Sequence, residues 1–318
     1  MKITGIGLYL PPKIQSAEDL SKKINKSSEW IISRTGVNER RISEIEVDEM
    51  GAIAAKEALG GETPDLILNA SGVGRQVIPD TSVFIQRKLN LEGVPSFSIQ
   101  ATCLSFLVAL KTVNAFLQND SFKKILIISS DRGTIGRNYN EPESAALLGD
   151  GAAAVLVEKS NNFEESCLEY WKMKTFSSGA DLTAVRGGGT RLHPQDPKTK
   201  LSDNLFSMDG PKIYKLARKK IYKMLLEMLK NKSINISDID LVIPHQASIT
   251  AIDAYVHYGR FNKEQVVNVI SKTGNCVAAS LPMALAMAYN DKRISRGDRL
   301  YLTGTGAGLS IISALIKF

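Results

Sequence analysis

The chain has 318 residues, of which 43% are hydrophobic and 23% charged, a composition typical of a globular protein with a large buried core. Its net charge is +7, but its basic residues form no DNA-binding motif and lack interleaved aromatic side chains, so nucleic-acid binding is not predicted. We expect no signal peptide and no membrane span, because no apolar run reaches roughly 18 residues. Three cysteines, odd in number, predict neither a disulfide framework nor a zinc site, which favours a reducing, cytoplasmic compartment.

The first half of the chain alternates predicted strands and helices. An opening strand is followed by short helices at 17–26 and 28–33, a polar turn at 34–41, a helix at 50–59, a strand at 65–71 and a helix at 80–89. A short apolar strand then ends near Gln100 and passes into an apolar helix, with Cys103 at the joint. Strands at 124–131 and 152–158 are continuous apolar runs, typical of a sheet that is covered on both faces.

The second half repeats this alternation. A strand begins at Cys167, and residues 183–205, with three consecutive glycines and two prolines, are a long irregular excursion. A basic helix at 210–231, a strand at 240–244 and a helix at 247–258 are predicted next. They are followed by a strand at 266–270, a buried helix at 276–289, a strand at 298–303 and a last segment at 309–318. Both halves therefore place a polar joint, at Cys103 and at Asn275, between an apolar strand and an apolar helix. This pattern predicts a layered α/β architecture, in which a duplicated half would bring the two joints together.

Cys103 allows two interpretations. At the point where a strand turns into a helix N-terminus, the sulfur faces unpaired backbone N–H groups, which favours the thiolate. A free cysteine is also a common buried packing residue. The stretch around Cys103 leaves both interpretations open.

One of the three histidines stands at a position suited to chemistry. His193 lies in the irregular excursion, and His257 lies near a helix end, where a cation is favourable. His245 directly follows a buried strand, where side chains of α/β proteins line binding sites. A cysteine at a helix start, a histidine at a strand end and an asparagine at the matching joint together suggest a site for thiol-acyl chemistry: Cys103, His245 and Asn275.

Short motifs that span nearly the whole chain make this prediction more specific. They lie at residues 29–36, 101–103, 149–152, 208–210, 244–247, 274–275 with 278–282, and 304–308. In order and spacing they resemble the β-ketoacyl-acyl-carrier-protein synthase III family of thiolase-fold condensing enzymes. The resemblance implies a five-layered αβαβα α/β fold and a homodimer. It also implies two pseudo-equivalent halves, residues 1–160 with the cysteine and residues 161–318 with the histidine and asparagine.

The resemblance implies a role for each candidate and requires no metal or other cofactor. Cys103 would take the acyl group from a thioester. The implied oxyanion donors are the backbone N–H groups of Cys103, Gly306, Ala307 and Gly308. Asn275 and His245 would both donate hydrogen bonds to the enolate that forms when a malonyl thioester loses carbon dioxide. His245 would donate from Nε2, so its tautomer must be set by a hydrogen-bond partner at the other ring nitrogen. Asp150, between two glycines, is predicted to fix a turn rather than to act as a base.

Acyl-CoA and acyl carrier protein are the substrate carriers that the resemblance implies. Trp30 and Arg34 match positions that contact the CoA nucleotide. An arginine that relatives often carry before the 149–151 motif is missing, and Glu141 and Glu143 stand there instead, where they would repel phosphates. The carrier-docking arginine after the active histidine is missing as well. A basic helix face is either a substitute docking surface or a plain solvated face: Lys212, Lys215, Arg218 and Lys219.

The predicted function is acyl transfer to Cys103 followed by decarboxylative Claisen condensation with a malonyl thioester, in fatty-acid or related acyl-chain biosynthesis. One alternative is an acyltransferase or ester-forming variant of the same fold in a specialised pathway. The other is a non-catalytic partner subunit. The intact His245–Asn275 pair favours condensation over simple acyl transfer, and the complete set of three groups argues against a non-catalytic subunit.

Overall fold

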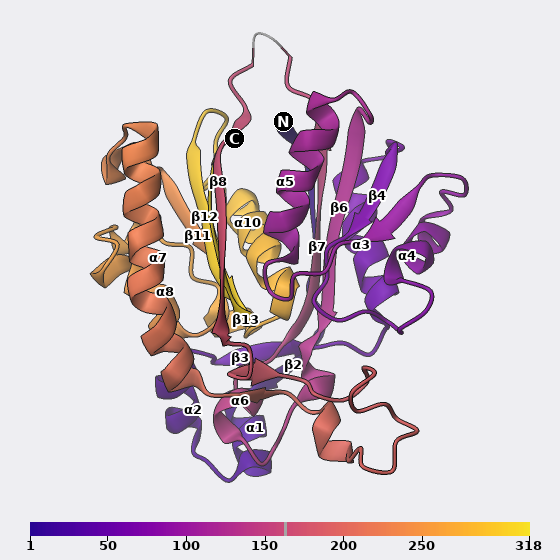
Figure 1. Cartoon of the computed structure of the whole chain (residues 1–318), viewed down its shortest axis with the longest axis vertical. Helices are drawn as coiled ribbons and strands as arrows, with labels where there is room; N and C mark the ends of the chain where they lie inside the picture. The colour runs from indigo at the N-terminus through magenta and orange to yellow at the C-terminus, as the bar shows by residue number, and fades with distance from the viewer. Residues whose placement is uncertain (162–163) are drawn as a thin grey trace.

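The computed structural model describes residues 1–161 and 164–318, which form two main β-sheets and the helices that cover them. The two sheets face each other with two helices between them, and further helices cover their outer faces (Figure 1). Across the molecule the layers are therefore helix, sheet, helix, sheet, helix. This arrangement confirms the predicted five-layered αβαβα architecture.

The first sheet has the strand order β1-β7-β6-β4-β5. Its strands are β1 (Lys2–Tyr9), β4 (Leu66–Asn69), β5 (Ser96–Ser98), β6 (Lys124–Arg132) and β7 (Asp150–Glu158). β4 runs parallel to β5 and β6, whereas β7 is antiparallel to β6 and β1. Strands β4, β6 and β7 are buried along nearly their whole length, which explains why their sequences are continuous apolar runs.

The second sheet has the order β11-β12-β13-β8. Its strands are β8 (Cys167–Gly179), β11 (Leu241–Pro244), β12 (Arg299–Gly306) and β13 (Gly308–Lys317). β11 is parallel to β12, and β13 is antiparallel to β12 and β8, so β8-β13-β12-β11 repeats the order and directions of β1-β7-β6-β4. The predicted boundary between residues 160 and 161 falls between the strands of the two sheets, and the division into two functional halves stays a prediction.

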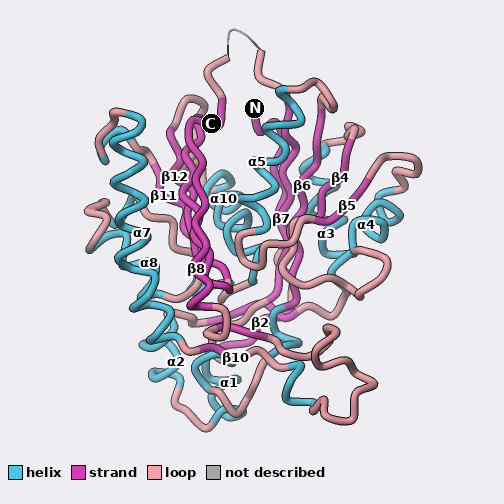
Figure 2. The backbone as a smooth tube through the Cα atoms, in the orientation of Figure 1, coloured by secondary structure: helices cyan, strands magenta, loops and turns pink. Residues whose placement is uncertain are grey.

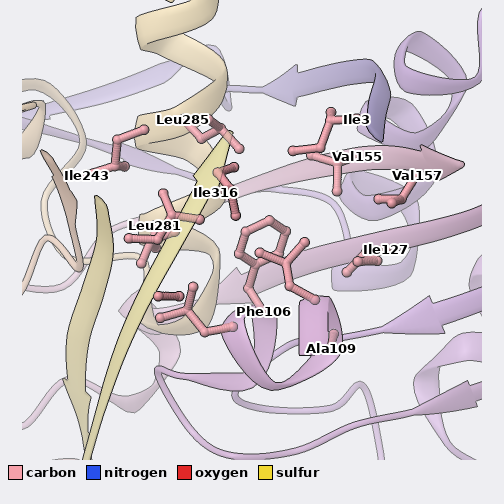
Figure 3. Packing of buried hydrophobic residues seen from close by; sticks show 14 of the residues in the cluster. Ile3, Phe106, Ala109, Ile127, Val155, Val157, Ile243, Leu281, Leu285 and Ile316 are labelled. Carbon is pink, nitrogen blue, oxygen red and sulfur yellow. The ribbon is translucent and has the colours of Figure 1, made fainter. Parts of the chain in front are cut away.

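The two central helices are α5 (Ser105–Gln118) and α10 (Ser280–Asn290). Both are apolar on nearly all sides, as expected of helices enclosed between two sheets. Figure 3 shows Phe106 of α5 and Leu281 of α10 in one core with Ile127 of the first sheet and Ile243 of the second. This shared core places the starts of α5 and α10, and the joints that precede them, in the interior of the molecule.

The outer helices cover the far faces of the two sheets. α3 (Val47–Leu59) and α4 (Thr81–Leu89) lie on the first sheet. α7 (Gly210–Lys232) and α8 (Ile249–His257) lie on the second, where Ile252 and Tyr255 pack against Val242 and Tyr301. Among the described residues, no helix is both long and apolar enough to cross a membrane.

A group of smaller elements closes one end of the molecule, as Figure 1 shows. They are α1 (Ala17–Ile24), α2 (Ser28–Thr35), α6 (Pro142–Ala145), the paired strands β2 (Lys13–Ser16) and β3 (Glu39–Ile42), and the paired strands β9 (Thr183–Ala184) and β10 (Ser207–Met208). The segment between β9 and β10 is mostly loop, with one short turn of helix (Figure 2), which confirms the predicted irregular excursion. Short helical turns complete the fold: η1 (Gly133–Gly136), η2 (Leu201–Asn204), η3 (Ile236–Asp238), η4 (Lys263–Gln265), α9 (Ile270–Thr273) and η5 (Val277–Ala279).

Three predicted elements differ from the structure. The expected polar turn at 34–41 contains the end of α2 and most of β3, because the backbone of β3 pairs with β2. The strand expected at 266–270 is reduced to one bridge between Val266 and Val242, since Ile270 already begins α9. The helix expected from residue 276 starts as the turn η5, and α10 begins only at Ser280.

Candidate active site

Cys103 lies in a tight turn between β5 and α5. Thr102, just before it, has φ = 52°, in the left-handed region that a threonine seldom adopts. The Ser105 hydroxyl fixes this turn by accepting from the Ala101 N–H at 2.9 Å and donating to the Thr102 carbonyl at 2.7 Å. The turn therefore holds Cys103 ahead of α5 in one defined backbone conformation.

The electrostatic surroundings of Cys103 contradict the expectation of a stabilised thiolate. Burial raises the pKa of the Cys103 thiol to about 12, with a further contribution from the nearby Asp131 carboxylate. The backbone N–H groups of Leu104 and Ser105 already donate hydrogen bonds within the turn, to the carbonyls of Ala101 and Thr102. These amides are thus not free to stabilise a negative sulfur. In the free protein these surroundings favour the protonated thiol of Cys103.

His245 follows β11 and is held by its own N–H, which donates to the Thr303 carbonyl at 2.8 Å. Burial lowers the pKa of its imidazole to about 4, so the ring is neutral at physiological pH. Nδ1 is buried and has no hydrogen-bond partner in residues 1–161 and 164–318, so the structure does not supply the expected partner that sets the tautomer. A proton on Nδ1 would be a buried donor without an acceptor, which favours the tautomer that carries its proton on Nε2.

Asn275 is held so that its amide nitrogen is left to donate. Its Oδ1 accepts from the Val277 N–H at 2.9 Å and from the Ser280 hydroxyl at 3.3 Å. Its backbone N–H donates to the Leu147 carbonyl at 2.8 Å, and its carbonyl accepts from the Gly149 N–H at 3.0 Å. Because a backbone N–H can only donate, the bond from Val277 fixes which end of the side-chain amide is oxygen.

The hairpin between β12 and β13 packs against the His245 turn and the Cys103 turn, and it contains the predicted oxyanion residues Gly306, Ala307 and Gly308. A Cβ on Gly304 would lie 2.6 Å from the His245 Cβ, and one on Gly306 would lie 2.7 Å from the Thr102 Oγ1. The hairpin therefore fits between His245 and the Cys103 turn only because these two positions are glycines.

A cavity of about 110 Å³ leads from His245 along α7. Its walls include Leu147 and Met208 near the site and, farther out, mostly apolar side chains of α7 and α8: Ile213, Tyr214, Ala217, Arg218, Ile221, Ala251, Ala254 and Tyr255. The lining includes Gly304 and His245 but neither Cys103 nor Asn275. An apolar passage of this kind suits a flexible arm that carries a thioester rather than a free charged substrate.

The predicted CoA contacts lie on the surface of α2, outside this cavity. Arg34 forms an ion pair with Glu143 at 2.9 Å, and both side chains are about half exposed. Trp30 packs on the cluster that contains Ala145 and Ala146, with the Lys26 ammonium 5.4 Å from its ring. Glu143, one of the two carboxylates expected to repel phosphates, is thus paired with Arg34, the arginine predicted to bind them.

The predicted docking residues share the exposed face of the first half of α7. Lys212, Lys215, Arg218 and Lys219 are all exposed. Lys212 pairs with Asp209 at 2.7 Å, whereas Arg218 also lines the cavity. The basic face therefore stands at the rim of the cavity that reaches His245.

Two buried aspartates support the site. Asp150 accepts from the N–H of Ser43 and Thr134 and from the Thr134 hydroxyl, at 2.8–2.9 Å, which confirms that it fixes local structure. Asp131, the last residue but one of β6, was not predicted from the sequence as a site residue, although its position near the polar end of a buried strand could have indicated it. Within the described residues, no group of three or more His, Cys, Asp or Glu side chains could hold a metal ion.

Comparison with known proteins places the chain in a family. The 3-oxoacyl-[acyl-carrier-protein (ACP)] synthase III model matches residues 97–175, and the model of its C-terminal part matches residues 229–318. The β-ketoacyl-[acyl-carrier-protein] synthase III of Rickettsia bellii is 31% identical over 325 residues, covering 100% of this chain and 99% of that protein. The Aquifex aeolicus synthase III is 32% identical over 327 residues, with coverages of 100% and 99%.

Solved structures agree with the sequence matches. The 3-oxoacyl-[acyl-carrier-protein] synthase III of Aquifex aeolicus gives a TM-score of 0.90 at 31% identity, covering 100% of this chain and 99% of that one. The enzyme from Pseudomonas aeruginosa gives 0.90 at 28% identity, covering 99% and 97%. These matches confirm the predicted thiolase-like fold and the predicted enzyme class, an acyltransferase of the condensing type. The chain belongs to the β-ketoacyl-[acyl-carrier-protein] synthase III family.

Proposed function

We propose that the protein condenses an acyl thioester with a malonyl thioester in two steps that use Cys103, His245 and Asn275. The observation that supports the proposal is the state of the donors: a neutral His245 beside the β12–β13 hairpin, which also packs on the Cys103 turn, and an Asn275 amide whose oxygen is already bonded. Neutral donors suit an enolate, because they stabilise developing charge without giving up a proton.

In the first step the Cys103 sulfur attacks the acyl thioester. The new C–S bond forms as the old one breaks, and the thiol proton of Cys103 ends on the departing thiol of the carrier. The Cys103 N–H and the hairpin N–H groups of Gly306, Ala307 or Gly308 stabilise the tetrahedral oxyanion. Because the thiolate is the attacking species, the raised pKa of the Cys103 thiol means that its proton must leave the sulfur as the C–S bond forms, and this proton ends on the departing carrier thiol.

In the second step the malonyl thioester enters along the cavity that leads to His245. The C–C bond to its carboxylate breaks, carbon dioxide leaves, and the electron pair forms an enolate whose oxygen accepts from His245 Nε2–H and the Asn275 amide. The enolate carbon then attacks the acyl-cysteine and expels the Cys103 thiolate, giving a β-ketoacyl thioester. No part of this scheme requires a metal or another cofactor, and it needs a reduced thiol, which favours the cytoplasm.

The side chains near the mouth of the cavity indicate which thioester carriers the protein binds. We take the basic face of α7 to dock acyl carrier protein, and Trp30 with Arg34 to receive the nucleotide of acyl-CoA. A CoA phosphate would have to displace Glu143 from Arg34, whereas a carrier protein would not. We therefore expect acyl carrier protein to be the better donor.

The reaction can be tested directly with purified protein. Acyl-CoA or acyl carrier protein supplied with malonyl-acyl carrier protein should give carbon dioxide and a product that is heavier by two carbons, detected by mass spectrometry. Acyl transfer to the protein without any release of carbon dioxide would overturn the proposal in favour of the acyltransferase alternative.

Reversal of two charges on α7 should weaken the carrier-protein reaction selectively. The Lys215→Glu, Lys219→Glu double variant is expected to lower kcat/KM for malonyl-acyl carrier protein about tenfold at low salt, because long-range attraction is lost. Malonyl-CoA should react nearly as before. The matched control reverses Lys230 and Lys232 at the other end of the same helix, about 20 Å away. An equal loss in both variants would rule out a local docking surface.

We further propose that the protein is a homodimer joined at β5. This strand is the outer strand of the first sheet, and Phe97 on it is 38% exposed. Val77 and Ile78, in the loop between β4 and α4, are 81% and 82% exposed. An open sheet edge flanked by exposed apolar side chains is a ready surface for a second chain. Sedimentation at micromolar concentration should show a dimer that Phe97→Lys weakens, and a wild-type monomer would contradict the proposal.

A further inference from the structure

Asp131 is a fully buried carboxylate that the two reaction steps do not use. It lies at the end of β6, with no exposed surface. Its Oδ1 accepts from the N–H groups of Gly72 and Val73, each at 2.9 Å. Its Oδ2 accepts from the Ala279 N–H at 3.1 Å. One carboxylate thus joins the loop after β4 to the start of α10.

On one side these bonds lead to the Cys103 turn. The Gly72 carbonyl accepts from the Gln100 side chain at 3.2 Å, and the Ser71 carbonyl accepts from the Ser105 hydroxyl at 3.1 Å. Ser105 is the residue that fixes the turn around Cys103. The loop that Asp131 holds is therefore the loop on which the nucleophile turn rests.

On the other side the bonds lead to Asn275. Ala279 ends η5, and the same short segment supplies Val277 and Ser280, the two donors that hold the Asn275 oxygen. The loop after β4 also packs on this segment, because a Cβ on Gly72 would lie 2.5 Å from the Val277 side chain. A shift of η5 would therefore move Asn275 relative to Cys103.

We propose that Asp131 is a positioning residue that holds the Cys103 turn and the Asn275 turn in the relative placement that condensation requires. This role rests on the proposed function. It does not involve contact with substrate. The Asp131 charge also raises the pKa of the Cys103 thiol, an effect that is independent of catalysis. The titratable groups that face Asp131 are Cys103 and Cys276.

The Asp131→Asn variant separates this role from a merely structural one. The amide oxygen can still accept from Gly72 and Val73, but the amide nitrogen cannot accept from Ala279, and the charge is gone. We expect the rate of condensation to fall about tenfold or more, with a smaller loss in acylation of Cys103, since small misplacements of reacting groups are costly. We also expect the pH midpoint for alkylation of Cys103 by iodoacetamide, followed peptide by peptide, to move to lower pH.

Asp150→Asn is the matched control, because Asp150 is equally buried and also accepts from backbone N–H groups. Its carboxylate faces Cys276 and not Cys103, so the alkylation midpoint of Cys103 should stay in place. If Asp131→Asn does not fold, Asp131→Glu, which keeps the charge, should keep the alkylation midpoint and still lose condensation more than acylation. Equal losses in condensation and acylation, or no loss in either step, would overturn the proposal. Alkylation needs no substrate, so a failure of the proposed reaction itself would be recognised separately.

Discussion

Replacement of Cys103 by alanine is expected to abolish acyl-enzyme formation while the protein stays folded. Wild-type protein incubated with acyl-CoA or acyl carrier protein should gain the mass of one acyl group, and Cys103→Ala should gain none. The neighbouring hydroxyls of Thr102 and Ser105 are not expected to replace the sulfur, because an unactivated hydroxyl is a far weaker nucleophile than a thiolate. The overall reaction should fall by at least about a thousandfold, as is usual when a covalent nucleophile is removed.

Cys167→Ala is the control for this experiment. Cys167 begins β8 and is partly exposed, so it is at least as accessible to a reactive thioester as Cys103. The control variant should take up the acyl group as the wild type does, in a form that hydroxylamine releases. A mass gain that persists in Cys103→Ala and disappears in Cys167→Ala would show that the nucleophile is assigned to the wrong cysteine.

The pKa of the Cys103 thiol is a property that the sequence alone did not predict. The position before a helix correctly locates the residue, but burial raises the pKa of its thiol by more than the backbone N–H groups lower it. The amides of Leu104 and Ser105 are bonded within the turn, and burial beside Asp131 outweighs what the helix end contributes. Neither effect is visible in the residues next to Cys103, since Asp131 lies 28 positions away in a strand of the same sheet.

The same limit applies to the fold. The apolar strands and the two central helices were predictable, because burial on all sides leaves a continuous apolar run in the sequence. β3 was not, since it is the polar stretch Glu39–Ile42 and forms only because β2 supplies its backbone partners. Its Arg40 is fully buried, against the ordinary expectation for a charged residue.

The same distinction applies to the candidate site, where some residues could be predicted from local sequence and others could not. Cys103 and His245 could be named because each follows a strand, and Asn275 because it precedes an apolar helix. The groups that hold them could not, because those contacts are made between distant segments. Asp131, for example, binds Gly72 and Ala279, which lie 59 and 148 positions away. Local sequence thus predicts which residues carry chemistry better than it predicts what positions them.

Replacement of Asn275 by alanine should separate the two steps of the reaction. Acylation of Cys103 does not use the Asn275 amide, so the variant should gain the acyl mass at a nearly normal rate. Decarboxylation should fall about 100- to 1,000-fold, the usual cost of removing one donor to a developing oxyanion. Release of carbon dioxide from malonyl-acyl carrier protein, measured beside acyl uptake on the same sample, provides both rates.

Asn275→Asp makes the test sharper, because its carboxylate can still accept from Val277 and Ser280 and so keep the turn in place. The donor is replaced by a negative oxygen, which would repel the enolate, so decarboxylation should fall at least as far as in Asn275→Ala. Asn268→Ala, an exposed asparagine in the segment before α9, should leave both steps intact. If Asn275→Asp restored decarboxylation that Asn275→Ala had lost, Asn275 would act by holding its turn and not by donating to the substrate. Loss of acylation in all three variants would instead point to a general disturbance of the site.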